Sequence, residues 1–191
     1  MSKKGDKMEV REAIKTRRAY RSLDPVVIRE EMIEELIEAV RLAPSCFNNQ
    51  PWRFVFVTEK AVLQEIFKTL SKGNEWATKA SLVIAVFSEK QLDCEIKGRE
   101  YYLFDTGMAT AFLILQATES GLVAHPIAGY DEEKVKEVLN IPKEMKVITL
   151  VIVGKHSDEI GELLTDKQKE IEKERPERLP KDKFIYFNRL P

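Results

Sequence analysis

The chain has 191 residues, with 31 basic and 32 acidic side chains and a formal net charge of -1. This length suits a single domain, which would bury roughly 70% of the surface that the unfolded chain exposes. The balanced charge leaves no global positive field that would gather nucleic acid or anionic lipid, so an anion site must be local. The longest apolar stretches, such as residues 82–87, are far below the ~20 residues that span a bilayer. We therefore expect neither a nucleic-acid partner nor a membrane partner.

Two cysteines, Cys46 and Cys94, are too few for a disulfide framework, and the first residues lack the apolar run of a secretory signal. We expect a cytoplasmic protein with reduced thiols, in which Cys46 is a small buried filler without a second cysteine nearby. Two histidines and no CxxC or HExxH motif argue against a metal site. The sequence also lacks a dinucleotide fingerprint, a phosphate loop and a GxSxG turn. For an enzyme of this composition, a bound organic cofactor is the more economical source of reactivity.

Hydrophobic periodicity and turn residues predict alternating helices and strands in the N-terminal half, after polar residues 1–7 that we expect to be disordered. The expected elements are a short helix from residue 8 to about 17, a helix over 32–40, a loop of fixed shape over 44–51, a strand over 53–58, a helix over 61–70 and a strand over 82–87 that is buried on both faces.

The C-terminal half combines a long apolar helix with a highly charged end. The expected elements are a largely buried helix over 99–120, a turn-prone segment over 124–129, a short helix over 132–139, a strand over 147–153, an exposed helix in the first part of 166–183 and an aromatic, strand-like segment over 184–188. Helices should cover both faces of the sheet. The aromatic tail either packs back on its own sheet or pairs with a partner's sheet edge, and the second alternative makes the protein an obligate dimer.

Two segments have a composition suited to ligand binding. Residues 15–21 hold four basic side chains at a helix end, which is typical either of a solvated surface or of a phosphate site, because the arginine fork fits phosphate oxygens. Residues 45–50 combine Ser, Asn and Gln side chains, which is typical either of a rigid turn or of a site for a heterocycle with ring N–H and carbonyl groups.

These segments resemble the flavin-dependent nitroreductase family. The motifs that carry the resemblance are Arg17-Arg-Ala-Tyr-Arg21 followed by Leu-Asp-Pro, Ala43-Pro-Ser-Cys-Phe-Asn-Asn-Gln-Pro-Trp52, Pro126-Ile-Ala-Gly-Tyr-Asp131 and Arg178-Leu-Pro. The resemblance implies an α+β fold, with a central, mainly antiparallel mixed sheet flanked by helices. It also implies an intertwined homodimer with exchanged C-terminal tails and one FMN in each of two interface clefts. Residues 8–180 would form the single FMN-binding domain, and 181–191 an extension on the partner.

The resemblance also implies a set of cofactor-binding residues: Arg17, Arg18, Ala19, Arg21, Pro44, Ser45, Asn48, Gln50, Asn74, Pro126, Ile127, Ala128, Gly129 and Arg178. Arg17 and Arg178 would bind the phosphate, with Arg175 as a substitute for Arg178. Arg21 would lie near N1 and O2 of the ring, where two-electron reduction places negative charge. Members of the family commonly carry Ser where Ala19 stands, so one hydroxyl contact to the phosphate is absent here.

The remaining residues of this set divide between the two subunits. Residues 44–50 would come from the partner, Asn74 would meet the pyrimidine edge, and the backbone N–H groups of Ala128 and Gly129 would lie near N5 and O4. The chain is short for the family, so we expect an open substrate site. A further aromatic group either lines that site or belongs to the core and the interface: Phe47, Trp76, Tyr101 and Tyr102.

The implied function is that of an FMN-dependent oxidoreductase. NAD(P)H would reduce the flavin, and an electron-poor acceptor such as a nitroaromatic or a quinone would then take its place in the same cleft, which is a ping-pong mechanism. No side chain is essential to this chemistry at flavin N5, and His125 is the one candidate proton donor. Two alternatives stay open. One is another flavin reaction on the same fold, such as dehalogenation, dehydrogenation or flavin reduction, and the other is a flavin-binding module without turnover.

Overall fold

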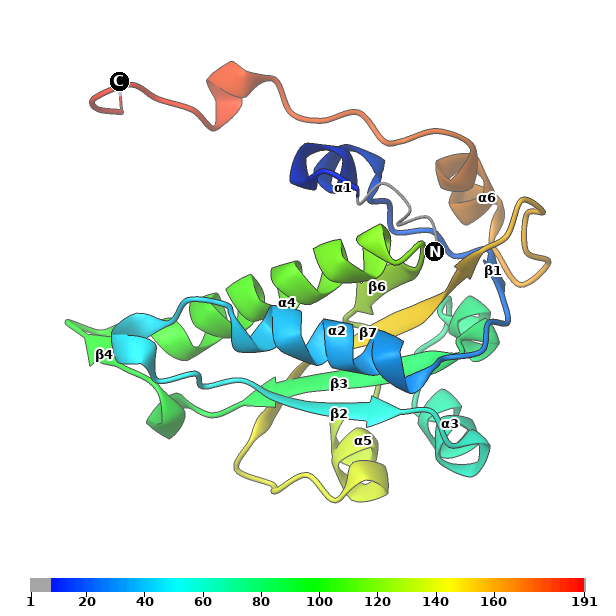
Figure 1. Cartoon of the computed structure of the whole chain (residues 1–191), viewed down its shortest axis with the longest axis horizontal. Helices are drawn as coiled ribbons and strands as arrows, with labels where there is room; N and C mark the ends of the chain where they lie inside the picture. The colour runs from blue at the N-terminus through cyan, green and yellow to red at the C-terminus, as the bar shows by residue number, and fades with distance from the viewer. Residues whose placement is uncertain (1–7, 191) are drawn as a thin grey trace, which may run out of the picture.

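Two apolar strands form the centre of the molecule: β3 (Leu82–Ser88), which is buried along its whole length, and β7 (Lys146–His156). The computed structural model describes residues 8–190, and the expected disorder of residues 1–7 lies outside that part of the chain. The sheet order is β1-β7-β3-β2, with β6 also paired to β7, and every pairing is antiparallel. Figure 1 shows this sheet in the middle of the molecule, with helices above and below it.

The remaining strands are short. They are β1 (Leu23–Asp24), β2 (Arg53–Val57), β6 (Val123–Ile127) and a separate hairpin of β4 (Glu95–Ile96) and β5 (Arg99–Glu100). The helices are α1 (Val10–Thr16), α2 (Glu30–Arg41), α3 (Lys60–Phe67), α4 (Tyr101–Glu119), α5 (Glu132–Leu139) and α6 (Asp166–Lys173), with 3-10 turns η1 (Cys46–Asn48), η2 (Glu75–Lys79), η3 (Lys90–Leu92) and η4 (Lys181–Lys183).

Successive side chains of the central strands point to opposite faces of the sheet, so alternate residues contribute to two separate hydrophobic cores. Along β3, Val83, Ala85 and Phe87 face one core, whereas Leu82, Ile84 and Val86 face the other. Leu63 and Ile66 of α3 and Val135 of α5 complete the first core. Leu36 and Val40 of α2 and Ala109 and Leu113 of α4 complete the second. The expectation of a sheet covered on both faces is confirmed.

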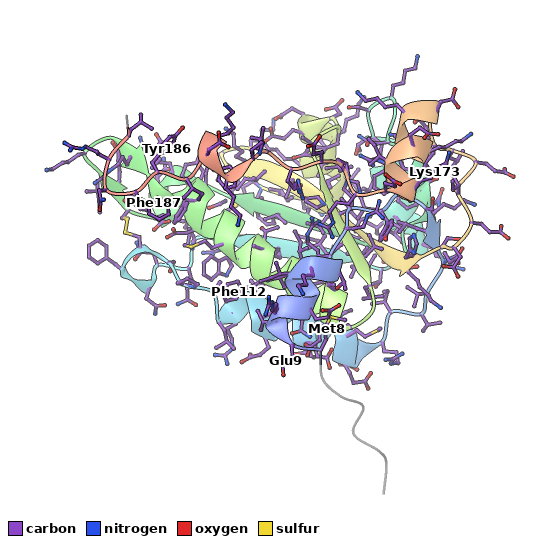
Figure 2. All side chains as sticks on the ribbon, turned by 90° about the horizontal axis from the view of Figure 1, so that it is seen from above. Met8, Glu9, Phe112, Lys173, Tyr186 and Phe187 are labelled. Carbon is purple, nitrogen blue, oxygen red and sulfur yellow. A yellow bond between two sulfur atoms is a disulfide. The ribbon has the colours of Figure 1, made fainter. Side chains whose placement is uncertain are left out.

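The ends of the chain lie outside these layers. From residue 174 to residue 190 every residue is exposed, and the chain leaves α6 and runs back across the molecule above α1 (Figure 1). Figure 2 shows this tail from above, where it passes from Lys173 at one end of the molecule to Tyr186 and Phe187 at the other. The expected strand over 184–188 does not form, because no strand in the described part of the chain pairs with it.

One local prediction is wrong. Residues 124–129, expected as a turn, are largely part of β6, which pairs with β7 from Val123 opposite Gly154 to Ile127 opposite Leu150. Proline lacks the N–H that a central strand needs, and its presence suggested a break. Pro126 is tolerated because, among residues 8–190, β6 pairs with β7 alone and its other edge makes no ladder.

The long helix α4 begins two residues later than expected, because residues 99–100 form β5. Its inner face is buried as predicted, but Leu103, Phe104 and Phe112 on the outer face stay exposed. Among the described residues, no helix combines the length and the apolar character needed to cross a membrane.

Candidate functional site

Three arginines meet where α1 ends and the chain leaves α6. Burial lowers the pKa of the Arg17 guanidinium, and the nearby positive charges of Arg175 and Arg178 lower it further. Within residues 8–190, none of these three arginines forms an ion pair with a carboxylate. The sequence-predicted pair Arg17 and Arg178 is therefore brought together, as a positive cluster without a counter-charge of its own.

The cluster is held by a reciprocal contact between two helix ends. Arg175 Nη2 donates to the carbonyl oxygens of Lys15 at 2.6 Å and of Arg17 at 2.8 Å, at the end of α1. Arg18 Nη2 donates to the carbonyl oxygens of Ile171 at 2.7 Å and of Glu172 at 3.1 Å, in the last turn of α6. Both guanidiniums meet the negative end of a helix. Arg18 and Arg175 thus position the cluster.

Arg21 is held by a buried carboxylate that the sequence did not reveal. Glu172 is 7% exposed, and its two oxygens accept the backbone N–H groups of Arg21 at 2.9 Å and of Ser22 at 3.0 Å. The Arg21 guanidinium lies 5.8 Å from the centre of the Trp76 ring, and burial lowers its pKa. Glu172 belongs to the charged segment 166–183. A single buried acidic residue among many exposed charged residues produces no periodicity that the sequence would show.

Asn74 and Gly129 form one unit. Asn74 Nδ2 donates to the Gly129 carbonyl oxygen at 2.9 Å, and the Ser71 N–H donates to the same oxygen at 3.0 Å. A Cβ at position 129 would lie 2.3 Å from Asn74 Nδ2, so only glycine fits here without displacing that side chain. The structure therefore joins two residues that the resemblance implied separately.

His125 lies in the core beneath this region. It is 6% exposed, its ring stacks 4.7 Å from that of Trp76, and Nδ1 lies 3.0 Å from the Tyr20 carbonyl oxygen. Burial lowers the pKa of His125 to about 4 against the opposing contact with Tyr20. The imidazole is neutral at pH 7, which removes the charge that a proton donor needs.

The other segment, residues 44–50, is a tight turn with an uncommon backbone. Phe47, Asn48 and Gln50 have φ of 48°, 59° and 49°, in the left-handed region that non-glycine residues rarely adopt. The Ser45 hydroxyl accepts the Gln50 N–H at 3.0 Å and closes the turn. Asn48, Gln50 and Phe47 are exposed, Phe47 at 83%, so the predicted loop of fixed shape presents its side chains outward.

The turn at 44–50 is also tied to a part of the chain that lies far away in the sequence. Cys46 forms a disulfide with Cys94, so the expectations of reduced thiols and of a buried filler are wrong. The Cys46 N–H donates to Asp105 at 2.6 Å, and Asn49 Nδ2 donates to Asp93 at 3.2 Å. Burial raises the pKa of Asp105, as does the nearby Asp93 carboxylate, against the opposing Cys46 N–H. An acid within the apolar sequence of α4 was the available signal for this contact.

A single chain does not bring the two predicted ligand segments together. In Figure 1 the coil that follows α1 runs toward β1 and α6 at one end of the molecule, whereas the turn at Cys46–Asn48 lies beside β4 at the opposite end. The other predicted residues near the first segment differ in exposure: Ala19 is partly exposed, Pro126 and Ala128 are exposed, and Ile127 is buried. Trp76 and Tyr102 are core residues.

Comparisons with known proteins agree on one family. A family model described as Nitroreductase family matches residues 14–155. The chain is 30% identical to a Bacillus subtilis (strain 168) protein named "Putative NAD(P)H nitroreductase YdgI", over 83% of this chain and 92% of that one. It also matches the crystal structure of an oxidoreductase containing FMN, with 27% identity and a TM-score of 0.80 over 100% of this chain and 96% of that one. A nitroreductase family protein from Clostridium novyi NT matches with 27% identity and a TM-score of 0.74, over 79% and 87%.

Proposed function

The chain belongs to the nitroreductase family, and from this premise we propose that it is an FMN-dependent oxidoreductase that takes electrons from NAD(P)H. Relatives named as NAD(P)H nitroreductases support the electron donor, and the similar oxidoreductase that contains FMN supports the cofactor. Within the molecule, the observation that carries the proposal is the meeting of Arg17, Arg175 and Arg178 without a carboxylate partner among the described residues.

The residues of the chain fit both the phosphate and the ring of FMN. A phosphate would supply the negative charge that the arginine cluster lacks, and the arginine fork suits its oxygens. For the ring, the Asn74 side chain is fixed against the Gly129 backbone, and the resemblance to the family implies that these two residues lie at the flavin ring.

Each residue has a defined part in this proposal. When bound, FMN supplies two-electron transfer at its ring system. Arg17 and Arg178 bind the phosphate, and Arg18 and Arg175 hold the helix ends that carry them. Glu172 fixes the backbone at Arg21, whose guanidinium stabilises the negative charge that reduction places on the pyrimidine side of the ring. Protons for the acceptor come from solvent, because His125 is buried and neutral.

We propose that two chains build each site. The turn with Ser45, Asn48 and Gln50 lies at the opposite end of the molecule from Arg17, so these side chains reach one ligand only if a second copy supplies them. The exposed apolar side chains of α1, α4 and the tail are the surface that such a dimer would cover: Val10, Ile14, Phe104, Phe112, Phe184, Ile185 and Phe187.

NAD(P)H and the acceptor would use the same open face of the flavin in turn, by a ping-pong mechanism, and the acceptor would be a nitroaromatic or a quinone. Purified protein titrated with FMN should quench flavin fluorescence at one FMN per chain. Anaerobic NADH or NADPH should then bleach the flavin absorbance, and initial rates with a quinone should give parallel double-reciprocal lines. Protein that neither purifies with FMN nor binds added FMN contradicts the proposal. Tight FMN binding without bleaching supports the flavin-binding module in its place.

A further inference from the structure

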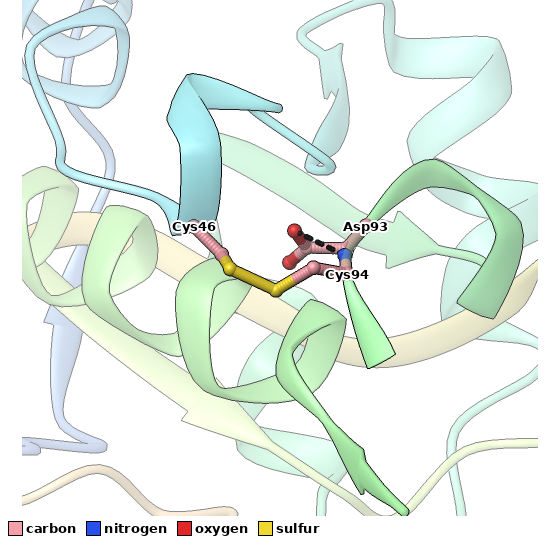
Figure 3. Close-up of side chains that lie close together, drawn as sticks. All are labelled: Cys46, Asp93 and Cys94. Atoms are coloured by element: carbon pink, nitrogen blue, oxygen red, sulfur yellow. Dashed lines mark hydrogen bonds between the residues drawn. A yellow bond between two sulfur atoms is a disulfide. The ribbon is translucent and has the colours of Figure 1, made fainter. Parts of the chain in front are cut away.

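The Cys46–Cys94 disulfide joins two segments that are 48 residues apart in the sequence. Figure 3 shows it running from η1 to the stretch between η3 and β4, with Asp93 beside it. Both cysteines are partly exposed, so a small thiol reagent can approach them. Immediately after Cys94 come the β4–β5 hairpin and α4, and the Tyr101 N–H donates to the Cys94 carbonyl oxygen at 3.2 Å.

The disulfide restrains a turn that needs restraint. Three non-glycine residues within four positions, Phe47, Asn48 and Gln50, have left-handed backbone, a conformation that persists only where the surroundings impose it. Outside the turn itself, three described side chains hold it by hydrogen bonds: Asp105 through the Cys46 N–H, Asp93 through Asn49, and Arg53 through the Gln50 carbonyl oxygen. The disulfide is stronger than any of these hydrogen bonds, and it is the one tie that a change of redox state can break.

A carboxylate lies beside the disulfide. Asp93 has a carboxylate oxygen within 4.8 Å of both sulfur atoms, and one of its oxygens is buried without a hydrogen-bond partner among the described residues. Reduction removes the covalent tie and leaves the turn held by hydrogen bonds alone, from Asp105, Asp93 and Arg53 outside it and from the Ser45 hydroxyl within it.

We propose that Cys46 and Cys94 are a reversible dithiol–disulfide modification site that sets the order of the turn at 44–50 and, through it, the affinity for flavin. The second part rests on the proposed function, in which this turn contacts the flavin of the partner copy. An external dithiol drives the reduction: one thiolate attacks a sulfur of the bond, and its second thiolate resolves the mixed disulfide. The protein gains two electrons and two protons as two thiols, and the reagent becomes a disulfide. A small-molecule disulfide drives the reverse reaction.

The experiment compares full-length protein in both redox states. Protein oxidised with a small-molecule disulfide and protein reduced with dithiothreitol, then desalted under argon, are examined by thiol titration under denaturing conditions, by hydrogen exchange of peptides covering residues 45–50, and by FMN titration. The double variant Cys46→Ser/Cys94→Ser is the matched control, because it lacks the bond in both treatments. Wild-type protein carries the main comparison, so the result does not depend on the folding of the variant.

We expect no free thiol after oxidation and two after reduction, faster exchange in 45–50 on reduction, and an FMN dissociation constant that rises roughly three- to tenfold as the turn loses its preorganisation. The double variant should resemble reduced protein under both treatments. Free thiols in the oxidised sample, unchanged exchange in 45–50, or equal FMN affinity in the two states would overturn the proposal. If exchange responds but neither state binds FMN, the proposed function fails while the thiol site stands.

Discussion

The arginines between residues 17 and 21 are alike in the sequence but differ in the structure. Arg18 is bound to the end of α6, Arg21 is placed by Glu172, and the pKa of Arg17 is lowered by the nearby charges of Arg175 and Arg178. Sequence composition left open whether this segment is a solvated basic surface. Arg18 is hydrogen-bonded to α6 and Arg21 is partly buried beside Trp76, so these two side chains are not freely solvated.

Substitution of Arg17 tests the phosphate role directly. Arg17→Met should raise the dissociation constant of FMN roughly 10- to 100-fold, as expected for the loss of a charge-assisted hydrogen bond. Binding of riboflavin, which lacks the phosphate, should change little. Fluorescence titration with both flavins measures the difference. Arg11→Met, an exposed position on the same helix, is the control. An equal loss for both flavins would show that Arg17 acts elsewhere than at the phosphate.

His125 predicts a pH dependence of stability. Its pKa is about 4 in the folded protein against 6.5 when unfolded, so between these values the unfolded chain binds the additional proton. The free energy of unfolding should therefore fall as the pH decreases from 6.5 to 4, by up to about 3 kcal/mol from this group. Urea denaturation of wild type and His125→Gln across this range isolates the contribution. The same slope in both proteins would contradict the assignment.

Among the elements, α6 has a role that its sequence does not suggest. Its composition predicts an exposed helix, and its outer face agrees, with ion pairs such as Lys173 to Glu170. In its last turn, however, the Glu172 carboxylate and the carbonyl oxygens of Ile171 and Glu172 accept hydrogen bonds from the segment that follows α1. The helix is thus the support that gives residues 17–22 a fixed shape, and the turn at 44–50 depends in a comparable way on α4 and the disulfide.

Loss of the Glu172 carboxylate should destabilise the fold. Glu172→Ala leaves the buried N–H groups of Arg21 and Ser22 without acceptors, which we expect to lower the free energy of unfolding by roughly 1–3 kcal/mol. Glu170→Ala, which removes only an exposed ion pair of the same helix, should cost at most about 0.5 kcal/mol. Chemical denaturation compares the two variants. Equal losses of stability would argue against a stabilising role of the Glu172 hydrogen bonds to the Arg21 and Ser22 N–H groups.

At the level of the whole molecule, the chain leaves many large apolar side chains exposed on α1, α4 and the tail. The tail contributes much of it, with Phe187 at 85% exposure, and the outer face of α4 adds Phe104 and Phe112. The proposed second copy of the chain would account both for these surfaces and for the separation of the two segments that we propose to bind flavin.

Removal of the tail should weaken both the dimer and the flavin site. Protein that ends at Asp182 should shift toward monomer in sedimentation velocity and bind FMN less tightly, because in the proposed dimer the tail would cover the partner and the partner would supply the turn at 44–50. Phe187→Ser should reproduce part of this effect, whereas Lys183→Ser, a polar change in the same tail, should not. A truncated protein that remains a flavin-loaded dimer would exclude the exchange of tails.

Most helices and strands could be predicted from the sequence. Apolar periodicity located α2, α3, α4, β2, β3 and β7, since burial of one face or of both leaves a pattern in consecutive residues. The motifs at 17–21 and 43–52 identified the family. The mistakes concern tertiary contacts: Pro126 lies in a strand that leaves one edge unpaired among the described residues, and Cys46 is bonded to Cys94. The aromatic tail does not pack on its own sheet, and its pairing with a partner stays a prediction.

Contacts between distant residues were decided only in three dimensions. Glu172 beneath Arg21, Arg175 on the end of α1 and Cys46 on Cys94 each join positions between 48 and 160 residues apart. No periodic pattern records such a pair, because one residue at one position carries no information about its partner. The sequence therefore identified the family and the two segments that we propose to bind flavin, whereas the folded chain showed that these segments lie at opposite ends and what holds each in shape.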